Sequence, residues 1–269
     1  MTIEPDGGAA LRALYEPSGG VRAIFSTKVA DYVASRPDYP PALFDALRKA
    51  CALRNDARIA DVGAGTGLLT RGWLERGYEV VAVEPNPAMR DACDRHCRAF
   101  ARYRSVEGTA EAMPLAAGSV DLVTAAQAFH WFDVERARDE CLRVLEPLGN
   151  VALVWNDRDM SDPLHTALDE VFAAFGGEKR SALVAHEDRS HVHQFFGAAQ
   201  TRVSTWPHEH SIDADALVAL AFSRSYMPER GTAAGKAAEE LLRQVFDRFA
   251  ANGALNVRYR TVLFLGRPA

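Results

Sequence analysis

A glycine-rich segment at residues 61–67, Asp-Val-Gly-Ala-Gly-Thr-Gly, joins a short apolar run to the start of a predicted helix. Glycine lets the backbone turn sharply, and it lets a ligand approach the chain where a Cβ atom would collide. The helix that follows begins with N–H groups that have no intrahelical partner. The segment therefore predicts a nucleotide or nucleoside site, and the alternative is an ordinary tight turn between a strand and a helix.

An acidic residue supports the interpretation of this segment as a ligand site. Glu84 ends the next predicted strand, about 20 residues after the glycines, where a carboxylate accepts hydrogen bonds from both hydroxyls of a ribose. The glycine spacing is G-x-G-x-G, whereas dinucleotide folds use G-x-G-x-x-G to pack a pyrophosphate against the helix. A turn of this kind, led by Asp61, suits a ligand without phosphates that has a cationic amino-acid end. The sequence therefore favours S-adenosylmethionine over NAD.

Residues that could act on a second molecule follow the fourth and fifth predicted strands, where open α/β sheets bind their ligands. His130 and Trp131 follow the fourth strand, and Arg158 follows the fifth. Because imidazole titrates near physiological pH, His130 is a candidate general base. The alternative is a packed histidine that shapes the floor of the pocket. Trp131 either lines that pocket or packs beneath the sheet.

The elements that must position these residues alternate in type. Apolar, β-branched runs are separated by helical stripes, which predicts a parallel sheet with helices on both faces. After Trp155 the rhythm changes to longer helices with two further strands. The predicted strands are residues 58–62, 79–84, 103–107, 120–126, 151–155, 200–212 and 257–265.

We expect one domain over residues 1–269, because we see no internal repeat and no linker. Residues 1–25 contain several glycines and prolines without periodicity, so we predict a flexible or lid-like N-terminus at residues 1–27. A cofactor-binding core follows at residues 28–160. Residues 161–269 are predicted to form substrate-side helices and the final strands.

The composition restricts the partners. The formal net charge of −5 gives little attraction to a phosphate backbone, and no apolar run is long enough to cross a bilayer. We therefore expect no nucleic-acid or membrane partner. Four cysteines are too few and too dispersed for a disulfide framework, which with the absence of a secretory signal indicates a cytoplasmic protein. Cys93, His96 and Cys97 share a predicted helix face, but no second ligand pair completes a metal site, and we expect no metal.

Three strings resemble the class I S-adenosylmethionine-dependent methyltransferases, namely DVGAGTG, VEPNPAMR (residues 83–90) and GTAEAMPL (residues 108–115). Four others, at residues 35–40, 125–133, 143–149 and 153–159, resemble the branch that includes trans-aconitate methyltransferases and related small-molecule enzymes. The match covers residues from about 28 to 160. It implies a Rossmann-like α/β fold, with a seven-stranded, mostly parallel sheet flanked by helices and an antiparallel last strand.

The resemblance implies cofactor-binding roles at the matching positions. The turn would contact the methionine portion, Glu84 would hold the ribose, and a group after the second and third strands would border the adenine. Relatives often carry aspartate where this chain has Thr109, which puts the hydrogen bond to the adenine amino group in doubt. Arg36 precedes Pro37, so we expect it to be extended and to meet the cofactor carboxylate. The full predicted set is Arg36, Asp61, Gly63, Ala64, Gly65, Glu84, Pro85, Met89, Thr109, Ala110, Glu111 and Gln127.

We expect the acceptor to contact Tyr32, Trp131, Arg158, Ser225 and Tyr226, and Arg224 or Arg230 to bind an acidic substrate unless both are solvated surface arginines. The leading hypothesis is an O-methyltransferase that acts on a carboxyl or hydroxyl group of a small molecule, as a monomer or homodimer. Nitrogen or carbon methylation of a secondary metabolite is an alternative. Binding of S-adenosylmethionine without methyl transfer is another.

Overall fold

A seven-stranded sheet forms the centre of the computed structural model, which describes residues 7–185, 189–197 and 201–268. The strand order is β3-β2-β1-β4-β5-β7-β6. The first five strands are parallel, and β7 lies antiparallel between β5 and β6. This confirms the predicted fold class and the antiparallel last strand. The strands are β1 (Arg58–Val62), β2 (Glu79–Val83), β3 (Tyr103–Val106), β4 (Val120–Ala126), β5 (Leu145–Arg158), β6 (Arg202–Ile212) and β7 (Leu255–Gly266).

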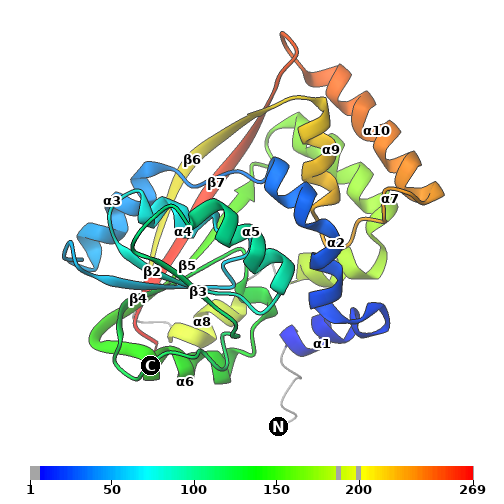
Figure 1. The fold of residues 1–269 in the computed structure, drawn as a ribbon. Helices are drawn as coiled ribbons and strands as arrows, with labels where there is room; N and C mark the ends of the chain where they lie inside the picture. Colours follow the sequence, from blue (N-terminus) through cyan, green and yellow to red (C-terminus); the bar gives the residue numbers. More distant parts are fainter. Residues whose placement is uncertain (1–6, 186–188, 198–200, 269) are drawn as a thin grey trace.

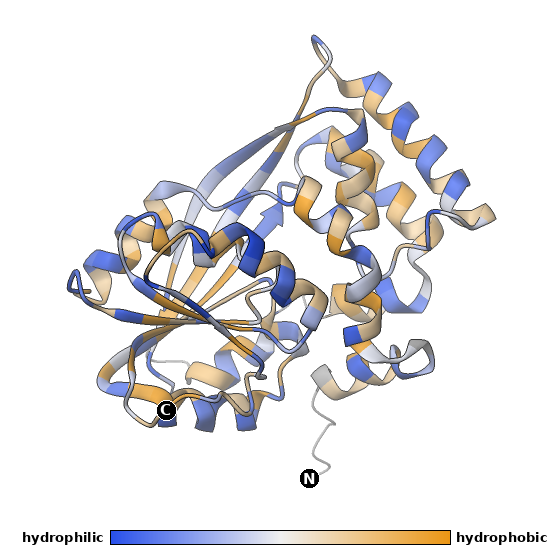
Figure 2. Cartoon of the chain, in the orientation of Figure 1, coloured by the Kyte–Doolittle hydropathy of each residue, from blue (hydrophilic) through white to orange (hydrophobic). Residues whose placement is uncertain are grey.

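Helices cover both faces of the sheet (Figure 1). One face packs against α3 (Pro41–Ala50), α4 (Leu68–Leu74) and α5 (Pro87–Cys97), and the other against α6 (Val134–Val144) and α8 (Ser190–Phe196). These helices alternate between apolar and polar faces, as the colours of Figure 2 show. Burial of the apolar faces against the sheet is the main favourable term in such a layered fold.

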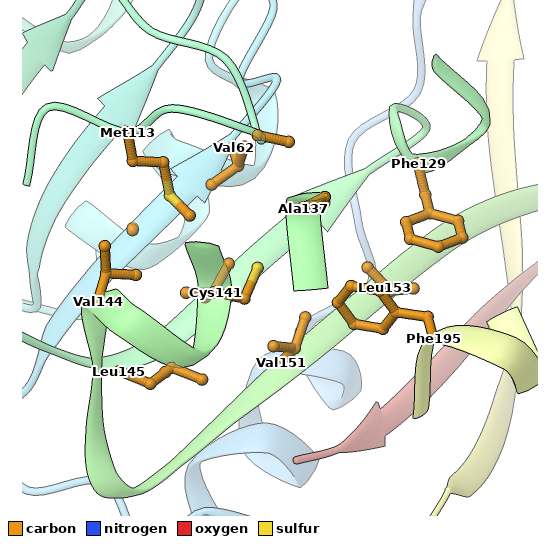
Figure 3. Packing of buried hydrophobic residues seen from close by; sticks show 14 of the residues in the cluster. Val62, Met113, Phe129, Ala137, Cys141, Val144, Leu145, Val151, Leu153 and Phe195 are labelled. Carbon is orange, nitrogen blue, oxygen red and sulfur yellow. The ribbon is translucent and has the colours of Figure 1, made fainter. Parts of the chain in front are cut away.

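The packing on the second face follows helical spacing. Ala137, Cys141 and Val144 of α6 lie against Val151 and Leu153 of β5 (Figure 3). Positions three and four apart share one side of a helix, so this side of α6 meets the sheet while its charged side faces solvent.

A separate group of helices stands at one end of the sheet, on the right in Figure 1. It contains α1 (Gly7–Ala13), α2 (Gly20–Ser35), α7 (Pro163–Ala185), α9 (Ala214–Phe222) and α10 (Ala233–Phe249). Residues of α7, α9 and α10 share a third apolar core with Ile212 and with Leu255, Val257 and Tyr259 of β7. This group lies beyond the ends of β4 and β5, where it can complete a ligand site.

The N-terminal region differs from our expectation. We predicted no regular element before residue 28, but α1 and α2 are helices, and Leu11 and Tyr15 are fully buried. The buried residues of α2 are Lys28 and Ser35, so this helix packs through polar groups and shows no apolar stripe in the sequence. Residues 1–6 lie outside the described residues, and the predicted lid role stays a prediction.

Helix α7 continues past Phe175 to Ala185 with a break at Gly177, and His191 and His193 lie in α8. His186 and the first predicted residue of the sixth strand, Gln200, lie outside the described residues. The structure contains the other predicted strands. The largest difference in boundaries is at β5, which spans Leu145–Arg158 where residues 151–155 were predicted.

Gly67 offers a test of the local fold. Its φ is +86°, and an added Cβ would lie 2.6 Å from Cys93 Sγ on α5. Gly77 has a similar φ of +82° but open space around the same position. We expect Gly77→Ala to lower the unfolding free energy by about 1–2 kcal/mol. Gly67→Ala should cost roughly 1–3 kcal/mol more because of the overlap. Urea unfolding measures both, and equal losses would show that α5 relaxes freely.

Candidate functional site

The glycine turn leaves β1 at its C-terminal end. Gly63, Gly65 and Gly67 all have positive φ values, which explains why glycine occupies each. The N–H of Gly63 donates to the carbonyl of Val83, 2.9 Å away, and ties the turn to β2. An added Cβ at Gly63 would lie 2.6 Å from Ala128 Cβ, whereas one at Gly65 would meet nothing within 4 Å. The turn is therefore packed on one side and open above Gly65.

Asp61 holds the turn from below. Its carboxylate is buried and accepts hydrogen bonds from Thr70 Oγ1 at 2.6 Å and Thr124 Oγ1 at 2.8 Å. Thr70 lies on α4 and Thr124 on β4, so Asp61 connects both elements to β1. Burial raises the pKa of Asp61 to about 6, against the opposing effect of the two hydroxyls. This geometry agrees with the expectation that Asp61 orients the turn.

Glu84 directly follows β2 and faces the turn. Its carboxylate, which is 7% exposed, accepts the N–H groups of Gly65 and Asn86, each at 2.8 Å. Burial raises the pKa of Glu84, and the two N–H groups oppose that rise. Each carboxylate oxygen keeps further acceptor capacity. A pair of hydroxyl donors such as those of a ribose fits this arrangement.

Asn86 and Arg22 join α2 to the segment after β2, a contact that the sequence did not predict. The side chain of Asn86 caps α5 by accepting the N–H groups of Ala88 and Met89, and its Nδ2 donates to the carbonyl of Arg22 on α2 at 2.7 Å. Arg22 in turn donates to the carbonyl of Pro85. The pair Asn86-Pro87 is a helix-start signal that could have found Asn86. Nothing in the sequence marks Arg22 as its neighbour.

A cavity of about 430 Å³ adjoins the turn. Residues from α2, from the ends of β4 and β5 and from the segment at residues 224–226 line it. It brings together nine predicted residues, namely Tyr32, Arg36, Gln127, His130, Trp131, Arg158, Arg224, Ser225 and Tyr226. A smaller cavity of about 20 Å³ lies over the turn and is lined by Asp61, Gly63 and Ala64. Tyr32, Tyr39 and Leu68 line both cavities, so the two are contiguous.

The predicted adenine residues are placed differently. Pro85, Met89, Thr109, Ala110 and Glu111 line neither of these two cavities among the described residues. Met89 and Ala110 are buried, and Thr109 forms a bridge with Ala112. The carboxylate of Glu111 accepts the N–H of Asp133 at 2.8 Å, which fixes the start of α6. Their contact with a cofactor stays a prediction.

Arg36 is extended, as expected before a proline, with φ of −72° and ψ of 135°. Its guanidinium is tied to the acceptor side of the site, because Nε donates to Ser223 Oγ at 2.8 Å. The guanidinium also stacks on the ring of Tyr32, 4.8 Å from the ring centre. Arg230, by contrast, pairs with Asp31 and does not line the cavity.

Gln127 and the residues after it form the floor next to the turn. Gln127 has a φ of +57°, which is unusual for a non-glycine residue and is frequent at functional sites. His130 lies in the short helix η2 (Phe129–Trp131), and its ring centre is 4.9 Å from that of Trp131. Trp131 also packs edge-on against Tyr15 and Phe25. Trp131 therefore both lines the cavity and packs beneath the N-terminal helices.

Among the residues described, no helix is long and apolar enough to cross a membrane. The same part of the chain contains no group of three or more side chains that could hold a metal ion. Cys93 and Cys97 are buried, and His96 Nδ1 contacts the carbonyl of Thr66 at 2.9 Å.

The sequence and the fold are similar to those of known methyltransferases. Residues 60–153 match a family model described as a methyltransferase domain. An uncharacterised methyltransferase of Mycobacterium tuberculosis is 39% identical over 202 residues, which are 75% of this chain and 76% of that protein. The chain belongs to this methyltransferase family. The structure of a putative type II methyltransferase from Anaeromyxobacter dehalogenans, 25% identical, covers 86% of this chain and 97% of its own, with a TM-score of 0.59. A malonyl-[acyl-carrier protein] O-methyltransferase of Enterobacter lignolyticus is 36% identical over 109 residues, 40% of this chain and 42% of that one.

The methyltransferase uses S-adenosylmethionine, and its residues fit that cofactor. The space above Gly65 admits a ligand against the backbone, and the Glu84 carboxylate offers acceptors for two hydroxyls. The class I resemblance of the sequence is confirmed.

We expect Glu84→Ala to weaken the binding of S-adenosylmethionine by about 1–3 kcal/mol, or roughly 10- to 100-fold, because buried charge-assisted hydrogen bonds are lost. Isothermal titration calorimetry measures the effect. Glu79→Ala is the control, since Glu79 is exposed at the opposite end of the same strand. Equal dissociation constants for the Glu84 variant and the wild-type protein would rule out the ribose role.

The raised pKa of Asp61 predicts that the stability of the fold depends on pH. Its pKa is raised from 3.8 to about 6 in the folded state, so the folded protein binds more protons between these values. The stabilising effect of Asp61 protonation is complete below pH 3.8 and is lost as the pH rises through 6. Between pH 4 and pH 7, the wild-type protein should lose about 2–3 kcal/mol of unfolding free energy that the Asp61→Asn variant keeps. Urea unfolding at both pH values tests this, and a constant difference would contradict it.

Proposed function

We propose that this methyltransferase methylates an oxygen atom of a small molecule, in a carboxyl or hydroxyl group. The observation that carries the proposal is the cavity of about 430 Å³ that joins the space over the glycine turn along Tyr32, Tyr39 and Leu68. A site of this size suits a small molecule. The partial match to a malonyl-[acyl-carrier protein] O-methyltransferase supports transfer to oxygen.

When bound, S-adenosylmethionine would supply a methyl group on a sulfonium, to which an acceptor oxygen would bond with its own electron pair while the pair of the C–S bond stays on sulfur. The protein then has to align the acceptor and exclude water. We assign the alignment to Gln127 and to the residues shared by both cavities. Tyr39, which is buried, and Leu68, which is half-buried, help to keep water out of this junction.

A hydroxyl acceptor must transfer its proton to a base, whereas a carboxylate acceptor carries no proton. His130 lines the cavity and is the candidate to receive the proton. The guanidinium of Arg36 is the candidate for holding the carboxylate of the cofactor. We also propose that the protein acts in the cytoplasm, without nucleic acid.

Turnover with radiolabelled S-adenosylmethionine and a panel of small phenols and carboxylic acids tests the function. We expect labelled ethers or esters, and we expect His130→Ala to lower kcat for phenols by about 10²- to 10⁴-fold without changing cofactor affinity. Esterification should be nearly unchanged in the same variant, which serves as the control. A near-normal rate with phenols would assign His130 to packing, and labelled N- or C-methyl products, or none, would contradict O-methylation.

A further inference from the structure

The large cavity contains more positive charge than the protein neutralises. Arg36, Arg158, Arg180, Arg189 and Arg224 all line it. The carboxylate of Asp169 pairs with Arg158 at 2.9 Å and with Arg180 at 2.7 Å, and the carboxylate of Asp157 pairs with Arg189. Neither Arg36 nor Arg224 has an ion pair with a described residue. Guanidinium groups do not lose their charge in proteins, so this part of the cavity favours an anion.

Two of these arginines contact the same aromatic ring. The guanidinium groups of Arg158 and Arg224 lie over the same ring, that of Phe172 on α7, at 5.5 Å and 4.5 Å from its centre. Each keeps one buried nitrogen without a hydrogen-bond partner, Nη1 of Arg158 and Nε of Arg224. A buried donor without a partner costs free energy. An anion that enters this place would offset that cost as well as the excess charge.

The chain holds Arg224 in place through its neighbours on the segment at residues 222–227. Lys28 Nζ on α2 donates to the carbonyls of Phe222 and Met227 at 2.9 Å and 3.1 Å. The hydroxyls of Tyr15 and Ser225 are 2.8 Å apart. A site whose side chains are fixed before the ligand arrives loses less entropy on binding, so the arginine pair is preorganised.

Aromatic side chains form other walls of the same cavity. Phe129, Trp131 and Phe132 follow β4, and Trp155 lies on β5. Their rings pack edge to face, Phe129 against both Phe132 and Trp155. Such walls suit a flat apolar body. Phe132 lies near the turn, since its ring is 3.8 Å from the Cβ position of Gly63, whereas Arg158 and Arg224 do not line the cavity over the turn.

We propose that the methyl acceptor is an organic acid with an aromatic or similarly flat apolar body, and that Arg158 and Arg224 bind its acid group. The acid group is an anchor that keeps its charge, and a second group on the same molecule, nearer the turn, accepts the methyl. This inference rests on the proposed function, because it assumes that the cavity holds the acceptor.

Calorimetry on the full chain saturated with S-adenosylhomocysteine tests the proposal. The probes are 4-hydroxyphenylacetate and its neutral amide, which share ring and hydroxyl, and glutarate, which has charge but no ring. We expect the aromatic acid to bind at least about tenfold more tightly than either. Arg224→Met should remove that preference and leave the affinity for the amide unchanged, and Arg224→Lys should recover part of it.

Arg243→Gln is the control, because Arg243 is an exposed arginine of α10 outside the cavity. Equal affinities for acid and amide, no binding of the aromatic acid, or an equal loss in the Arg243 variant would overturn the anchor. Equal binding of glutarate would overturn the apolar body. These results would leave the proposed function intact if S-adenosylhomocysteine binds, whereas failure of S-adenosylhomocysteine to bind would refute both proposals.

Discussion

The carboxylate of Asp61 is the group on which the geometry of the cofactor side depends. It is buried at the end of β1, and its two threonine donors come from α4 and β4. A buried carboxylate without such donors would cost several kcal/mol, so the three elements are held in one arrangement. Both ends of the glycine turn are thereby fixed, since β1 enters it and α4 leaves it.

The position of Glu84 follows from the same arrangement. β1 and β2 are parallel and in register, with Val62 beside Val83. The residue after Val83 therefore lies next to the turn, and its carboxylate reaches the N–H of Gly65. The stretch of sequence between the glycines and Glu84 has the length of one helix and one strand, α4 and β2. This is why the donor site could be predicted from a linear pattern.

The lining of the large cavity could be predicted only in part. His130, Trp131 and Arg158 could be placed there because they follow strands whose ends meet at one edge of a parallel sheet. The sequence does not show that Arg158 and Arg224, which are far apart along the chain, share the ring of Phe172. That proximity depends on how α7 and α9 pack beside the sheet. The helical N-terminus was missed for a related reason, since α2 buries Lys28 and Ser35 and has no apolar stripe.

Helix α2 contacts both halves of the site. Near its start, Arg22 contacts Pro85 and Asn86 beside the proposed ribose position, and further along, Lys28 and Asp31 hold the segment that carries Arg224. A helix of 16 residues shifts largely as one body, so a movement caused at one end is felt at the other. Linkage then requires any effect of the donor on acceptor affinity to be matched by an equal effect of the acceptor on donor affinity. Any coupling between the binding of the two ligands would therefore pass through α2.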